Sequence, residues 1–165
     1  MVSVVPPGIF AAIAVALSTA SISTQDDPYT GTWILDLARS GGESRTQILT
    51  IEVQGDQETY RSELVWADGR RQVTTYVARY DGREYPSVTL LEGGPEERSE
   101  RRDDTVILRK LDERRRERLW KQGGRIVRIL RRSVAPDGMT MSSQVVDVDE
   151  RGKETVASTL VFDRR

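Results

Sequence analysis

Two arginines, Arg128 and Arg132, lie four residues apart in the apolar segment Arg125–Val134. Side chains four residues apart share one face of an extended strand, here together with Ile126, Leu130 and Val134. Two guanidiniums on such a face can hold a carboxylate through bidentate hydrogen bonds. The alternate residues of the segment are no less apolar, so the sequence leaves open which face points inward.

Large aromatic residues are a second source of binding chemistry: Tyr60, Trp66, Tyr76, Tyr80, Tyr85 and Trp120. Most are expected to fill a core or its rim, because buried aromatic rings contribute large apolar areas. A pocket lined by a few of them is the alternative. Tyr60, Trp66 and Tyr76 are the candidate ligand-binding members.

Residue types exclude several kinds of catalysis. The chain has no histidine and no cysteine, which excludes Ser-His and Cys-His nucleophile pairs, the usual zinc sites and disulfides. Acidic residues are not set at calcium-loop spacing, so we expect no metal and no cofactor. Glu63 or Asp147 could act as an acid or base, but no spacing singles out a pair. We therefore expect a binding protein rather than an enzyme.

Charge is unevenly distributed along the chain. The 25 basic and 26 acidic residues all follow Gln25, and residues 98–132 hold 14 basic and 6 acidic residues. The near-zero net charge argues against a nucleic-acid partner. The basic segment predicts either an anion-attracting face or, as we favour, charge neutralised by acidic neighbours across a sheet.

The N-terminal segment is typical of a signal peptide. Residues 1–20 include the apolar run Ile9–Ala20, which has the length of a signal-peptide core and is short for a membrane span. Cleavage is predicted after Ala20, with Ser23 as an alternative. The lack of Lys or Arg before the run leaves an uncleaved anchor or a buried helix open. We expect a secreted or periplasmic protein, with residues 21–30 as a linker and no transmembrane segment after cleavage.

From Gly31 to Arg165 the sequence predicts one all-β domain. Period-2 alternation recurs between turn signals such as Asp68-Gly69 and Asp81-Gly82, whose glycines suit tight hairpins. Residues 91–104 are predicted as an exposed loop, and Asp112–Lys121 as a strand or hairpin rather than a helix. The spacing favours about 8–10 antiparallel strands in an up-and-down barrel, because closure removes exposed edges. The alternating segments are 33–38, 49–53, 60–66, 73–78, 105–111, 116–121, 125–134, 139–148 and 154–162.

Three blocks carry a family resemblance: Gly31-Thr32-Trp33 with the residues that follow, Tyr80–Pro86, and Arg131–Met141. The first matches the Gly-x-Trp element of lipocalins and other calycin barrels. Over Tyr29–Phe162 the chain resembles secreted bacterial lipocalin-like proteins of unassigned function. It departs from them in the charged residues 92–104 and in the arginine-rich strand after Leu111.

The resemblance implies a small calycin-type barrel in which Gly31 and Trp33 close the floor. It also implies that an arginine from a late strand stacks on Trp33, a contact worth ~0.5–2 kcal/mol. Arg131 and Arg132 are the candidates for this role, with Arg164 an outsider. The family provides no catalytic residues.

These observations predict a barrel that binds a small apolar or amphipathic molecule, including an anionic one. The alternative is a filled barrel that acts through its surface as an envelope-associated interaction or structural module. An unrecognised hydrolase or isomerase is a third hypothesis and would require two convergent carboxylates in a cleft. The sequence does not indicate an oligomeric state.

Overall fold

A computed structural model describes residues 27–41, 45–93 and 100–165. The predicted signal peptide and the first part of the linker lie outside these residues. The described chain forms ten strands: β1 (Gly31–Leu35), β2 (Arg45–Gln54), β3 (Gln57–Trp66), β4 (Arg71–Arg79), β5 (Glu84–Glu92), β6 (Glu100–Lys110), β7 (Arg115–Gln122), β8 (Arg125–Val134), β9 (Thr140–Val148) and β10 (Glu154–Arg164).

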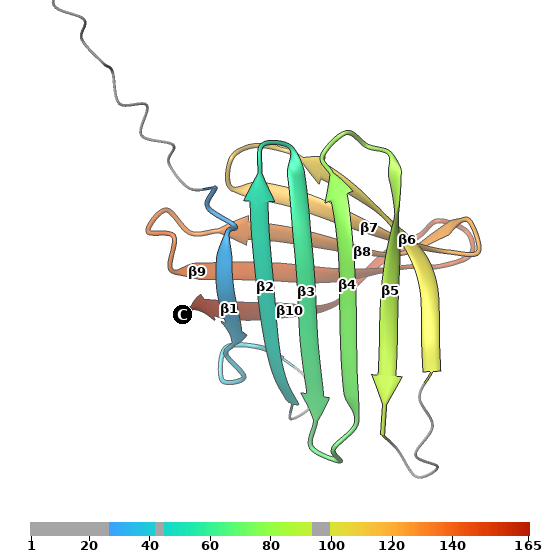
Figure 1. Cartoon of the computed structure of the whole chain (residues 1–165), viewed down its shortest axis with the longest axis horizontal. Helices are drawn as coiled ribbons and strands as arrows, with labels where there is room; N and C mark the ends of the chain where they lie inside the picture. The colour runs from blue at the N-terminus through green and yellow to red at the C-terminus, as the bar shows by residue number, and fades with distance from the viewer. Residues whose placement is uncertain (1–26, 42–44, 94–99) are drawn as a thin grey trace, which may run out of the picture.

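Each strand pairs with the next in antiparallel register, and β1 pairs with β10 from Trp33↔Arg164 to Leu35↔Phe162, which closes the barrel. The predicted all-β, up-and-down barrel is therefore confirmed. Figure 1 shows β2 to β5 standing side by side in front while β7 to β10 cross behind them, and β6 bends from one layer into the other. No helix in the described part of the chain is long and apolar enough to cross a membrane.

Tight turns join the strands where the sequence predicted them. Gly69 and Gly82 have φ angles of 85° and 75°, which glycine adopts without the steric penalty of a Cβ atom. The segment after Leu111 turns at once into β7, so the prediction of a hairpin rather than a helix is confirmed. Successive turns lie at opposite ends of the barrel, so each end is surrounded by every second turn.

The predicted loop 91–104 is wrong at both of its ends. β5 continues to Glu92 and β6 begins at Glu100, with Thr89 opposite Arg102 and Leu91 opposite Glu100. Arg101 and Arg102 are exposed although their backbones belong to the ladder. Arg101 lies on the outer face opposite the exposed Leu90, and Arg102 lies opposite the buried Thr89 but keeps its side chain exposed, so neither charge has to be buried for the strand to form. Residues 94–99 lie outside the described chain.

A β-bulge in β8 decides which of its residues face the interior. The pairing passes from Trp120↔Arg128 to Lys121↔Ile126, which leaves Val127 as the extra residue. Because a bulge shifts the alternation by one residue, Ile126 does not share a face with Arg128 as predicted. Ile126 packs instead against Leu119, Ile129 and Val146, which form a second apolar cluster. Their positions alternate with those that face the interior.

The main core fills the end of the barrel where the chain enters. Tyr29 and Trp33 are completely buried, and Met141 and Phe162 pack with them. This half of the barrel is filled by side chains. The opposite, hollow half contains a cavity.

Candidate functional site

The filled end is closed by an interlocked floor. The Trp33 indole N–H donates to the backbone oxygen of Tyr29 at 2.9 Å. The Arg164 guanidinium lies 4.6 Å from the centre of the Trp33 ring and donates to the Pro28 oxygen. Gly31 has a φ of 144°, in the range that favours glycine, and its backbone lies beside the Arg164 side chain. Tyr29, predicted as part of a linker, is thus a core residue.

The cation that covers Trp33 is Arg164, not the predicted Arg131. Arg131 donates to Glu117 at 3.1 Å and to Glu154 at 2.6 Å, in a partly exposed set of ion pairs. It alternates along β8 with Leu130 and Arg132, which face the interior. The Arg131 side chain therefore points to the outer face of the barrel and cannot reach the floor. Arg164, in contrast, lies opposite Trp33 in the β1–β10 register.

Above the floor lies a buried ionic network around Glu58, whose side chain has no exposed area. Arg132 donates to the two Glu58 oxygens at 3.0 and 3.3 Å. The Tyr76 hydroxyl donates to the same carboxylate at 2.5 Å, and the Tyr80 hydroxyl donates to its other oxygen. Burial raises the pKa of the Glu58 carboxyl, but the charge of Arg132 and these hydrogen bonds outweigh burial and hold the pKa below its usual value.

Arg116 is the second buried cation and is also neutralised. It forms an ion pair with Asp27 and donates to the Tyr80 hydroxyl at 2.8 Å. Its guanidinium lies 4.2 Å from the Tyr29 ring centre and 4.6 Å from that of Tyr80. Burial raises the pKa of the Tyr29 hydroxyl to about 12. Arg116 and Arg132 therefore belong to the structure of the barrel.

Arg118 differs from the other two buried arginines. It is 7% exposed, and no ion pair with it exists in the described part of the chain. Its Nε and Nη1 atoms are buried without hydrogen-bond partners, as are Nε and Nη1 of Arg132 and Nε of Arg116, so the missing ion pair is what distinguishes Arg118. The guanidinium instead lies on aromatic rings, 4.6 Å from the centre of Tyr60, which is itself stacked on Tyr76. Burial of a charge without an opposite charge is costly, and cation–π contacts offset only part of that cost.

Arg118 lines a cavity of ≈ 290 Å³ in the hollow half of the barrel. Tyr60, Trp66 and Trp120 supply aromatic walls, and the lining contains three arginines but no aspartate or glutamate. Of the other two arginines, Arg45 has a buried Nε atom without a partner. Arg128 is partly exposed and donates to Asp147 at 2.8 Å. The cavity is therefore cationic, and one of its charges, Arg118, is buried without an ion pair.

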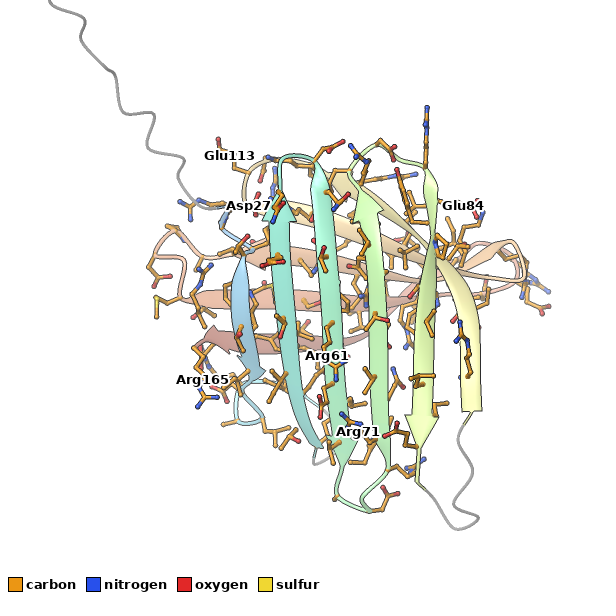
Figure 2. The ribbon with its side chains drawn as sticks, in the orientation of Figure 1. Asp27, Arg61, Arg71, Glu84, Glu113 and Arg165 are labelled. Atoms are coloured by element: carbon orange, nitrogen blue, oxygen red, sulfur yellow. The ribbon has the colours of Figure 1, made fainter. Side chains whose placement is uncertain are left out.

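A larger depression of ≈ 690 Å³ lies at the filled end, where its lining includes Asp27 and Glu113. Figure 2 shows both residues at the end where β1 begins. Turn residues from several hairpins form this surface and carry charges of both signs. Its buried unpaired nitrogen, Arg164 Nε, belongs to the guanidinium that covers Trp33. Among the described residues that line it, no other buried side-chain nitrogen or oxygen lacks a hydrogen-bond partner, so the smaller cavity is the better candidate site.

Of the predicted ligand-binding residues, Tyr60, Trp66 and Arg128 line the cavity together. Tyr76 lies beneath it, against Tyr60 and Glu58. Arg132 lies deeper and is held by Glu58, so the predicted pairing of Arg128 with Arg132 around one carboxylate does not occur. Sequence reasoning missed Arg118. The signal was present in β7, where Arg116, Arg118 and Trp120 occupy every second position.

The described residues contain no metal site beside this cavity, and the comparisons with known proteins give no family. In residues 27–41, 45–93 and 100–165 no three Asp or Glu side chains gather where they could hold a metal ion. The closed ten-stranded antiparallel barrel is compatible with a lipocalin-like fold. No protein-family model matches the chain, and no curated protein matches it.

Proposed function

We propose that this protein is a lipocalin-like binding protein that holds a small amphipathic organic anion in its barrel cavity, with Arg118 as the anchor for the anionic group. The observation that carries the proposal is the buried guanidinium without an ion pair, on the wall of a cavity without acidic residues. A carboxylate in the cavity would supply the missing opposite charge.

Two further features support a ligand with an apolar body. Three large aromatic side chains line the cavity together with aliphatic ones such as Leu130 and Leu160. The volume is close to the lower limit of the ~300–1,000 Å³ found for small-molecule pockets, so the ligand is compact. The alternative, a filled barrel that acts through its surface, has no role for a hollow half or for an unpaired arginine.

Export remains part of the proposal and is supported by the charge-free run Ile9–Ala20. The absence of histidine and cysteine also suits a binding role.

The test is a titration of tryptophan fluorescence with decanoate and with decanol, since Trp66 and Trp120 line the cavity. Decanoate should bind more tightly than decanol. In Arg118→Met, decanoate affinity should fall about 10- to 150-fold, the effect of losing a charge-assisted hydrogen bond of ~1.5–3 kcal/mol. The matched control is Arg61→Met, on the exposed outer face of β3 (Figure 2). Equal binding of decanoate by wild type and Arg118→Met would refute the proposal.

Stability separates a binding role of Arg118 from a structural one. Met has a similar length and carries no charge, so Arg118→Met removes an unpaired buried cation together with its aromatic contacts. The two effects oppose each other, and we expect a change in unfolding free energy of no more than ~1 kcal/mol. A loss of ~3 kcal/mol or more would mean that Arg118 serves the fold.

A further inference from the structure

The cavity has two chemically different walls. In the closed ring of ten strands, β3 and β8 are five strands apart in either direction and therefore lie opposite each other. The wall of β2, β3 and β4 contributes Gln47, Ser62, Gln72 and Thr74, whereas that of β8, β9 and β10 contributes Leu130, Val145, Ala157 and Leu160. The exceptions are Leu64 and the aromatic Tyr60 and Trp66 on the first wall, and Arg128 and Ser158 on the second.

The polar wall keeps unused hydrogen-bonding capacity. Gln47 Nε2 donates to Ser62 Oγ at 3.1 Å, and Gln72 Nε2 donates to Thr74 Oγ1 at 3.3 Å. Within the residues that the structure describes, no hydrogen bond uses the Ser62 hydroxyl proton or the side-chain carbonyls of the two glutamines. A free donor thus lies beside a free acceptor. A hydroxyl group can both accept and donate, so it matches this pair.

The distance from Arg118 indicates where that hydroxyl belongs. Ser62 follows Tyr60 by two residues on β3, a separation of about 7 Å along a strand. The Arg118 guanidinium lies on the Tyr60 ring, and a carboxylate hydrogen-bonded to it lies about 3 Å further on. Ser62 thus lies one strand repeat from the Tyr60 ring that carries Arg118, so a hydroxyl close to the carboxylate can reach it and one at the far end of a long acid cannot.

We infer that the ligand is a hydroxylated carboxylic acid, with its carboxylate on Arg118, a hydroxyl group near the carboxylate on the Gln47–Ser62 pair, and its apolar side against Leu130, Val145 and Leu160. This inference rests on the proposed function, because it assumes that the carboxylate binds at Arg118. It adds to the proposed function a prediction of which side of the ligand carries a polar group. A simple alkanoate would leave the Ser62 donor and the glutamine acceptors without partners.

The test is calorimetric titration with three acids of equal chain length: 3-hydroxydecanoate, decanoate and 10-hydroxydecanoate. The last has the same composition as the first but carries its hydroxyl at the far end. We expect 3-hydroxydecanoate to bind about 2- to 10-fold more tightly than the other two, the effect of one or two neutral hydrogen bonds. Ser62→Ala should remove this preference and leave decanoate affinity within about twofold of wild type.

Two further variants test the role of the polar wall without relying on Ser62→Ala alone. Gln47→Leu removes the neighbouring amide and should also reduce the preference. Thr59→Ala, an exposed hydroxyl on the same strand, should leave it unchanged. If all three acids bind equally and all depend on Arg118, the inference fails while the proposed function stands. If none of the three binds, both fail. A preference that persists in both Ser62→Ala and Gln47→Leu would overturn the assignment of the polar wall.

Discussion

Replacement of Glu58 by glutamine tests the reasoning about the buried charges most directly. Glu58 is completely buried and accepts hydrogen bonds from Arg132, Tyr76 and Tyr80. Glutamine has nearly the same shape but no charge. The substitution therefore leaves Arg132, which is 4% exposed, as a buried cation without an ion pair. Removal of one partner from a buried ion pair typically costs ~3–5 kcal/mol, and we expect that loss at neutral pH.

The same pair makes stability depend on pH. The pKa of the Glu58 carboxyl is lower in the folded protein than in the unfolded chain, where glutamate has its ordinary value of about 4.3. The folded state therefore binds the proton less readily, and the stabilisation is fully present above about pH 4.3. It is lost as the pH falls through the lower, folded pKa. Glu58→Gln has no such carboxyl, so the difference between wild type and variant should shrink in acid.

Urea unfolding followed by tryptophan fluorescence at about pH 7 and about pH 3 measures both effects. The matched control is Glu63→Gln on the same strand, which breaks partly exposed pairs with Arg61 and Arg71. Such exposed pairs contribute ~0–1 kcal/mol. If Glu58→Gln costs no more than Glu63→Gln, or if the difference from wild type grows in acid, the buried network does not stabilise the fold as argued.

Two further predictions concern the floor and the N-terminus. Trp33→Ala should lower the unfolding free energy by ~3–5 kcal/mol, because Trp33 is completely buried beneath Arg164; a change below ~1 kcal/mol in urea melts would mean that Trp33 does not close the barrel. N-terminal sequencing of exported protein should begin at or within a few residues of Ser21. Intact Met1 on soluble cytoplasmic protein would contradict export.

The barrel could be predicted because its determinants are local. The alternation of side chains and the Asp-Gly turns at Asp68-Gly69 and Asp81-Gly82 each depend on a few neighbouring residues. The strand β5 was not recognised, since Pro86 and the charged residues that follow Leu91 interrupt the apolar pattern. Its register is instead set by its neighbours β4 and β6. Patterns of apolar residues thus underestimate strands whose outer face is charged.

The candidate site could not be predicted because the residues that form it are far apart in the sequence. Glu58 and Arg132 are 74 residues apart in the sequence, and no local pattern indicates that one neutralises the other. The basic excess of residues 98–132 was expected to be neutralised across the sheet. Exposed or partly exposed pairs such as Arg131–Glu117 and Lys121–Glu84 agree with that expectation. Arg116, Arg118 and Arg132 are buried inside the barrel instead, and a count of charges cannot separate exposed from buried arginines.

The three buried arginines, Arg116, Arg118 and Arg132, support the proposal that the cavity binds an anion. Arg116 is neutralised by Asp27 and Arg132 by Glu58, so two of the three buried arginines have an acidic partner within the fold. The chain has 26 acidic residues to 25 basic ones, and many of the acidic ones form ion pairs on the surface. None of them lines the cavity beside Arg118. An unneutralised buried charge lowers stability unless something else supplies the opposite charge, and a bound anion is the partner that this geometry accommodates.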